Sequence, residues 1–152
     1  MNLLKAPRST RIASCTLIWA AAAFAACGES STSVEPREPA HRLEGTWQWV
    51  SSQDLSSDVL HTPESTGDNA SLTFEASSSQ GGAFLYSVTG SDDVHGDFVI
   101  GNEDAGGPEF IAIEPGIGFL AGHAWLAVGE DRLILTGFTS PRFLSTYVRS
   151  KY

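Results

Sequence analysis

Residues 43–152 predict an all-β domain, a small antiparallel up-and-down β-barrel of about eight strands. Apolar and polar residues alternate with period two in short segments, which is typical of half-buried strands. Turn-forming residues interrupt these segments every eight to twelve positions, as they do in sandwiches and barrels. After residue 26, no window keeps a 3.6-residue period over three turns, so we expect no helix in the core.

The individual strands follow from the alternation, taken in chain order. Residues 45–51 place Trp47 and Trp49 on one face, and residues 70–76 alternate in the same way. Residues 58–62 fit either an additional short strand or part of a loop. The remaining expected strands are 83–89, 94–100, 110–113, 123–128, 132–137 and 143–149.

The connections between these strands favour closure into a barrel. They are rich in turn-forming residues and too short for the crossovers that parallel strands need. Seven or eight antiparallel strands have to close on themselves or stack as a sandwich, because exposed edges invite association. The strands follow one another without the long return connection of a Greek key, so we expect the barrel rather than the sandwich.

The amino-terminal residues have the layout of an export signal. Lys5, Arg8 and Arg11 form a basic patch, and the apolar run 12–26 follows it. A membrane-spanning helix needs roughly 20 apolar residues, and this run is shorter. Residues 1–26 are therefore interpreted as a signal peptide rather than a transmembrane helix.

The motif Phe24-Ala25-Ala26-Cys27 resembles the lipobox of bacterial lipoproteins. Cys15 ends a similar motif, but no long apolar segment precedes it, so position selects Cys27. The resemblance implies acyl chains on Cys27, and two or more chains give lasting membrane attachment. Gly28 in the next position implies the outer membrane of a two-membrane bacterium. We therefore expect an exported, lipid-anchored protein of the cell envelope.

Three segments result: the signal peptide 1–26, the lipidated cysteine with a flexible tether 27–42, and the domain 43–152. The tether composition is Ser, Thr, Glu and Pro with almost no apolar residue. With both cysteines in or next to the leader, no disulfide is expected in the domain. Removing the three leader charges from the formal −9 leaves −12, and such an acidic chain is not expected to bind nucleic acid.

Several segments of the domain resemble the small bacterial lipocalin-like domains. These are 43–51 (LEGTWQWVS), 62–67 (TPESTG) and 72–74 (LTF) near the start, and 131–135 (DRLIL) and 147–149 (YVR) at the end. The resemblance implies a lipocalin-like barrel. It also implies that the indole of Trp47, in the Gly45-x-Trp47 element, is covered by an arginine from a late strand, for which Arg149 is the candidate.

Motifs of catalytic chemistry are not found in the sequence. It contains no Gly-x-Ser-x-Gly, His-Glu-x-x-His, Cys-x-x-Cys or phosphate-binding loop, so we expect no enzyme, no catalytic residue and no cofactor. His95 with Asp93 and Asp97 could share one face of a strand and suit zinc. Solvated acidic residues near a turn explain the same pattern, and no metal site is predicted.

Aromatic residues supply the candidate ligand site. An eight-stranded barrel either fills its interior with side chains or holds one small molecule. The residues expected to contact a small apolar ligand are Trp49, Phe74, Tyr86, Phe98 and Trp125. The alternative is a filled core in a structural or protein-interaction module, with a loop such as 101–109 contacting an unidentified protein partner.

Overall fold

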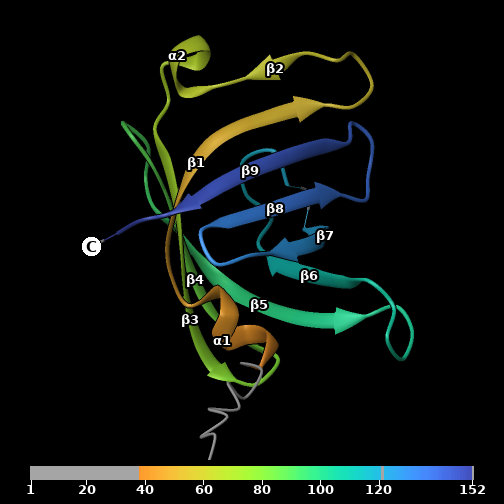
Figure 1. Ribbon diagram of the computed structural model, residues 1–152. Coiled ribbons are helices and arrows are strands. Elements are labelled where there is room, and N and C mark those ends of the chain that lie inside the picture. Colours follow the sequence, from red (N-terminus) through yellow and green to blue (C-terminus); the bar gives the residue numbers. More distant parts are fainter. Residues whose placement is uncertain (1–37, 121, 152) are drawn as a thin grey trace, which may run out of the picture. The chain divides into compact units, whose positions relative to one another are not determined.

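The computed structural model describes residues 38–120 and 122–151, which belong to one compact unit. This unit is a closed antiparallel β-barrel of eight strands with a short ninth strand attached (Figure 1). The predicted fold class is therefore confirmed. The signal peptide, Cys27 and most of the tether lie outside the described residues. The strands are β1 (Gly45–Asp54), β2 (Leu60–His61), β3 (Ala70–Ser78), β4 (Gly81–Val88), β5 (Val94–Asn102), β6 (Glu109–Glu114), β7 (His123–Val128), β8 (Arg132–Gly137) and β9 (Phe143–Arg149).

The barrel closes because β1 pairs on both sides. Its first half pairs with β3, with Trp47 opposite Leu72, and its residues 47–54 pair with β9, with Trp47 opposite Arg149. From β3 to β9, each strand pairs antiparallel with the next one in the chain. This is the expected up-and-down meander, and a sandwich is excluded.

Strand boundaries agree closely with the sequence pattern in the last third of the chain. Strands β7, β8 and β9 have the predicted limits. Strand β1 runs three residues further than expected because a register shift between Trp49 and Ser51 lets pairing with β9 continue. Of the two interpretations of 58–62, the strand is observed, reduced to β2 on the end of β1.

The inward face of the barrel forms one hydrophobic core. Alternate residues of each strand point inward, as the two-residue period of strands requires. At its centre, the rings of Phe74 and Phe98 meet edge to face, with their centroids 5.0 Å apart. The largest fully buried side chains include Trp47, Phe74, Phe98, Leu43, Leu72, Ile111, Leu133 and Leu135.

A short helix, α1 (Pro39–Leu43), closes one end of the barrel, here called the α1 end (Figure 1). Ala40 and Leu43 are fully buried, and the indole Nε1 of Trp47 donates to the carbonyl of Leu43 at 2.7 Å. Arg42 pairs with Glu109 on β6. This corrects the expected tether, because residues 39–42 belong to the folded domain, with Ala40 in its core.

Arg149, near the end of β9, contacts the start of β1 and helix α1 at the α1 end. Its guanidinium carbon lies 4.1 Å from the ring centroid of Trp47, so the predicted cation–π contact is confirmed. The three guanidinium nitrogens donate to the carbonyls of Glu130, Glu44 and Arg42. One side chain thereby ties β9, the start of β1 and helix α1 together.

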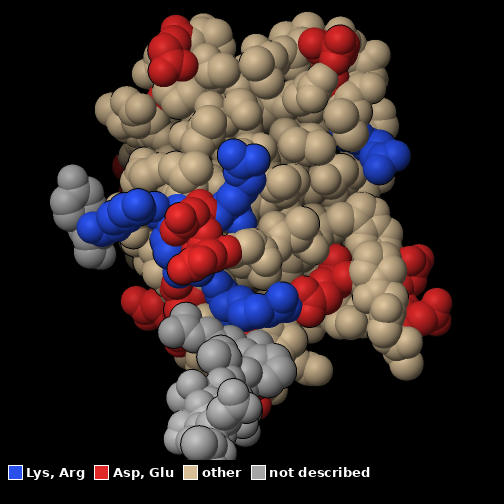
Figure 2. All heavy atoms as spheres, viewed as in Figure 1, with Lys and Arg blue, Asp and Glu red and all other residues tan. Residues whose placement is uncertain are grey.

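The opposite end, here called the α2 end, carries the one-turn helix α2 (Pro63–Thr66) (Figure 1). The loop between β6 and β7 folds over this end and buries Ile117 and Leu120, whose backbones bond to each other. In the described part of the chain, no helix is long and apolar enough to cross a bilayer. On the face seen in Figure 2, basic and acidic side chains gather together near α1.

Candidate functional site

A small cavity lies inside the barrel at the α2 end, and we call it the mouth cavity. Its volume is about 40 Å³. Side chains from β1, β3, β4, β9 and two loops converge on it, although they are far apart in the sequence. The lining residues are Trp49, Asp68, Ala70, Tyr86, Val88, Phe119 and Tyr147.

Trp49 is fixed in this lining by a buried polar network. Its indole Nε1 donates to the Ser52 hydroxyl at 2.9 Å, and that hydroxyl shares a 2.7 Å hydrogen bond with Ser145 on β9. Both serines are fully buried. Because the bulge in β1 changes the register after Trp49, Ser52 points inward where a simple alternation would place Ser51. The network therefore sets the orientation of the indole from two strands.

Phe119 is held by rings around it. Its centroid lies 5.8 Å from that of Trp49, 4.9 Å from Phe143 and 5.2 Å from His61, which stacks on it. The neighbouring Gly118 has a φ of +49°, and a Cβ there would lie 2.6 Å from the Tyr86 hydroxyl. Glycine is needed at 118 because the loop backbone packs directly against that phenol.

Burial keeps the two phenols of the mouth cavity in their neutral form. Burial raises the pKa of Tyr147 far above its usual range, and the proximity of Tyr86 raises it further. Burial also raises the pKa of Tyr86, with a contribution from the Asp68 carboxylate. Both phenols are therefore neutral at pH 7, and Asp68 carries the formal charge of the lining.

The size of the mouth cavity limits what it can hold. A water molecule occupies about 30 Å³ of the liquid, whereas pockets for drug-sized ligands measure about 300 to 1,000 Å³. A cavity of about 40 Å³ accommodates a group of very few heavy atoms. The interior below it is occupied by the packed rings of Trp47, Phe74 and Phe98.

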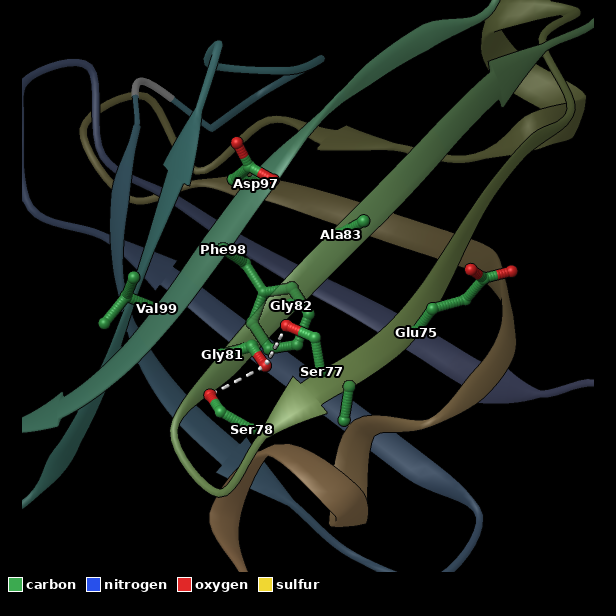
Figure 3. Close-up of a pocket in the computed structure, with 10 residues that line it drawn as sticks. Glu75, Ser77, Ser78, Gly81, Gly82, Ala83, Asp97, Phe98 and Val99 are labelled. Atoms are coloured by element: carbon green, nitrogen blue, oxygen red, sulfur yellow. Dashed lines mark hydrogen bonds between the residues drawn. The ribbon is translucent and has the colours of Figure 1, made fainter.

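A larger hollow lies on the outer surface of β3, β4 and β5, and we call it the outer groove (Figure 3). Its volume is about 460 Å³. Three small residues of β4, Gly81, Gly82 and Ala83, are part of its lining. Glu75 and Asp97 lie on opposite sides of it in Figure 3. The hydroxyls of Ser77 and Ser78 donate to the carbonyl of Gly81, so both hydroxyl protons are already engaged within the protein.

The five sequence-predicted ligand residues occupy three different environments. Trp49 and Tyr86 line the mouth cavity. Phe74 and Phe98 are packed into the centre of the core, 1% exposed each. Trp125 lies on the outer face of β7, because its neighbours Ala124 and Leu126 point inward. The structure thus brings two of the five together in a cavity and separates the other three from it.

Trp125 belongs instead to a cluster on the outside of the barrel, here called the outer aromatic cluster, formed by Phe110, Trp125 and Phe138. Phe110 pairs directly opposite Trp125 across β6 and β7. The ring centroids of Trp125 and Phe138 lie 4.5 Å apart. Phe138 is 37% exposed, so the cluster presents aromatic surface to solvent.

Three aromatic or charged residues of the lining were not predicted from the sequence, namely Asp68, Phe119 and Tyr147. Tyr147 lies on an expected strand, and its alternation with the buried Ser145 could have indicated that it points inward. Asp68 and Phe119 lie in loops, where no periodic pattern shows which side chains reach the interior.

The alternative zinc site gains no support from the side-chain arrangement. His95 and Asp97 are exposed on β5, and Asp93 is exposed in the turn before it. Within residues 38–120 and 122–151, no group of three His, Cys, Asp or Glu side chains is arranged to hold a metal ion.

No protein-family model and no curated protein sequence matches this chain. Among solved structures, the chain is similar to a de novo designed fluorescence-activating β-barrel. The sequence identity is 10%, the TM-score is 0.47, and the match covers 74% of this chain and 98% of the designed one.

Proposed function

We propose that this protein is a lipid-anchored lipoprotein of the cell envelope whose barrel is a non-catalytic binding domain, with its ligand site at the mouth cavity. The observation that carries the binding role is the aromatic lining of a cavity at the barrel end away from α1. Concave sites lined by aromatic side chains with a few polar groups are typical of ligand binding.

The proposed ligand is small, or inserts only a small group. The core below the cavity is filled, so the barrel has no room for the fatty-acid or haem-sized ligands that larger barrel cavities enclose. This narrows the expectation of an apolar ligand in the barrel interior to a compact group at its mouth.

The binding site can be tested by a screen of small organic fragments against the full chain in maltoside detergent, followed by NMR of the tryptophan indole N–H signals. We expect binding fragments to shift the Trp49 signal and to leave Trp125, on the outer face, unchanged. A screen in which no fragment moves Trp49 would contradict the proposed site.

The proposed anchor rests on the basic patch, the apolar run and Cys27 in the sequence. Intact mass of the protein extracted from membranes tests it: we expect a chain that starts at Cys27 and carries acyl chains. Cys27→Ser should remain in the precursor form and lose membrane attachment. An unmodified Cys27 in the mature protein would refute the anchor without affecting the barrel.

A second candidate function is protein interaction through the outer aromatic cluster. The observation in its favour is the exposure of Phe138 beside Trp125, since aromatic residues are enriched in interface cores. Phe138→Ser should abolish any cross-linked complex formed in the envelope, while Val148→Ser, on the exposed face of β9, should not. Equal cross-linking of both variants would argue against this surface.

A further inference from the structure

The composition of the mouth cavity indicates the charge of its ligand. Four of its seven lining residues are aromatic, and Asp68 is the one charged residue among them. The faces of aromatic rings are electron-rich and attract cations, with tryptophan the strongest. A lining that combines four such rings with a carboxylate suits a cation better than a neutral apolar group.

The rings are held in place before any ligand arrives. Trp49 is oriented by the Ser52–Ser145 pair, and Phe119 packs against Trp49, His61 and Phe143. Prearranged contacts favour binding because little side-chain freedom is lost on association.

The position of Asp68 places its negative charge at the rim. Asp68 is exposed, whereas Tyr147, in the same lining, is 4% exposed. Burial raises the pKa of Tyr86, and the Asp68 carboxylate raises it further, which places this carboxylate close to the phenol of Tyr86 in the lining. A cation entering the mouth cavity would pass the Asp68 carboxylate and then contact aromatic rings of the lining.

We propose that the mouth cavity binds the head of a small alkylammonium ion, with the aromatic lining contacting the cation and Asp68 supplying the counter-charge at the rim. A volume of about 40 Å³ admits the ammonium nitrogen with one or two attached carbons. This inference rests on the proposed function and names the class of ligand for that site.

The matched pair of probes is ethanolammonium and ethylene glycol. These molecules have the same number of heavy atoms and differ by an ammonium in place of a hydroxyl. The full chain in maltoside is titrated with each at constant ionic strength, and the indole N–H signals are followed by NMR. We expect ethanolammonium to shift the Trp49 signal in a saturable manner, glycol to leave it unmoved, and neither to move Trp125. Equal shifts by both probes, or no shift by either, would overturn the proposal.

Variants then test the two components of the site. Phe119→Leu keeps an apolar side chain but removes a ring, and Asp68→Asn keeps the size and removes the charge. Each should weaken ethanolammonium binding about 3- to 10-fold, as expected for loss of one cation–π or ion-pair contact. Phe138→Leu, in the outer aromatic cluster, is the control and should bind as the unmodified chain does. Because Asp68 is exposed, Asp68→Asn is expected to fold, and unchanged affinity in this variant would contradict the role of the carboxylate.

The same chemistry is available as a free amine or as the head group of an ethanolamine lipid. Vesicles of phosphatidylglycerol with and without phosphatidylethanolamine separate these sources. Once soluble ethanolammonium has shifted the Trp49 signal, a further shift with vesicles that contain phosphatidylethanolamine, and none with phosphatidylglycerol alone, shows that the site also accepts the lipid head group. No shift with either kind of vesicle assigns the site to the free amine. If neutral fragments move Trp49 while no ammonium probe does, the binding site stands and the ligand class is wrong.

Discussion

Ser52 and Ser145 are the two fully buried polar side chains in the barrel interior of the described chain. A buried hydroxyl without a partner costs about 1 to 3 kcal/mol. This cost is avoided because the two hydroxyls bond to each other and Ser52 also accepts from the Trp49 indole. The three side chains also connect β1 and β9 at the closure of the barrel. The hydrogen bonds of Trp49, Ser52 and Ser145 therefore lie where β1 and β9, the first and last strands of the barrel, pair with each other.

The two serines are not equivalent. Ser52→Ala removes the partner of both the Trp49 indole and the Ser145 hydroxyl, and we expect it to lower the free energy of unfolding by about 2 to 3 kcal/mol. Ser145→Ala leaves the Trp49 bond intact and should cost about 1 kcal/mol. Urea denaturation measures both, and equal losses in the two variants would be inconsistent with the network.

The burial of Tyr147 makes the free energy of unfolding depend on pH in the alkaline range. Its pKa is raised in the folded state, mainly by burial, so its stabilising contribution is present below the pKa of an unfolded tyrosine, about 10, and is lost as pH rises above that value. The free energy of unfolding should therefore fall above about pH 10. Tyr147→Phe should flatten this decline, and an unchanged pH profile would show that Tyr147 ionises freely.

At the scale of the elements, the hairpin of β3 and β4 depends on a glycine. A Cβ on Gly82 would lie 2.0 Å from the carbonyl oxygen of Glu75 and 2.8 Å from the Cα of Ala76, both backbone atoms. The strands approach this closely where the register shifts between Ala76 and Ser78. The hairpin therefore has to open locally to accept any side chain there.

Gly82→Ala should lower the free energy of unfolding by about 2 to 3 kcal/mol, because the backbone has to move. Gly67→Ala is the matched control: it has a φ of +79° but no atom within 4 Å of the new Cβ, so conformational strain alone should cost about 1 kcal/mol. Thermal or urea denaturation ranks the two. A smaller loss at 82 than at 67 would mean that the crowding at this hairpin is easily relieved.

The strands were the part of the fold that could be predicted from the sequence. Alternation located β7, β8 and β9 to the residue, because one face of each packs on the core and the other meets water. The bulge after Trp49 could not be predicted, since it depends on pairing with β9, nearly a hundred positions away. Helix α1 was missed because five residues are too few to show a helical period, and its burial comes from tertiary contacts.

For the site, sequence patterns identified aromatic residues but not their grouping. Period two places Trp49 and Tyr86 inward, yet it does not say how deep each lies along the barrel axis. Phe74 and Phe98 are also inward and fill the centre instead. Trp125 shows the remaining difficulty: its strand carries apolar residues on both faces, so alternation alone does not decide which face is the core.

For the whole molecule, the domain boundary predicts a difference between two truncated chains. A chain that begins at Glu35 keeps α1, whereas one that begins at Leu43 lacks the buried Ala40, the pair of Arg42 with Glu109, and the Arg42 carbonyl that accepts from Arg149. We expect the shorter chain to be less stable by about 2 kcal/mol. Urea denaturation of the two chains measures this, and equal midpoints would place α1 outside the cooperative unit.

The contacts of Arg149 have a consequence for the order in which the molecule can be completed. A ribosome or export channel delivers β1 first and β9 last, yet residues 47–54 of β1 pair with β9, and Arg149 at the end of β9 lies over the ring of Trp47. Until Arg149 emerges, the first strand keeps an open edge and the Trp47 ring lacks its cation–π contact. The barrel can therefore close only late, through contacts between residues far apart in the sequence. Such non-local pairing makes β-proteins fold slowly, and the exposed strand edges of the incomplete barrel can associate with other chains.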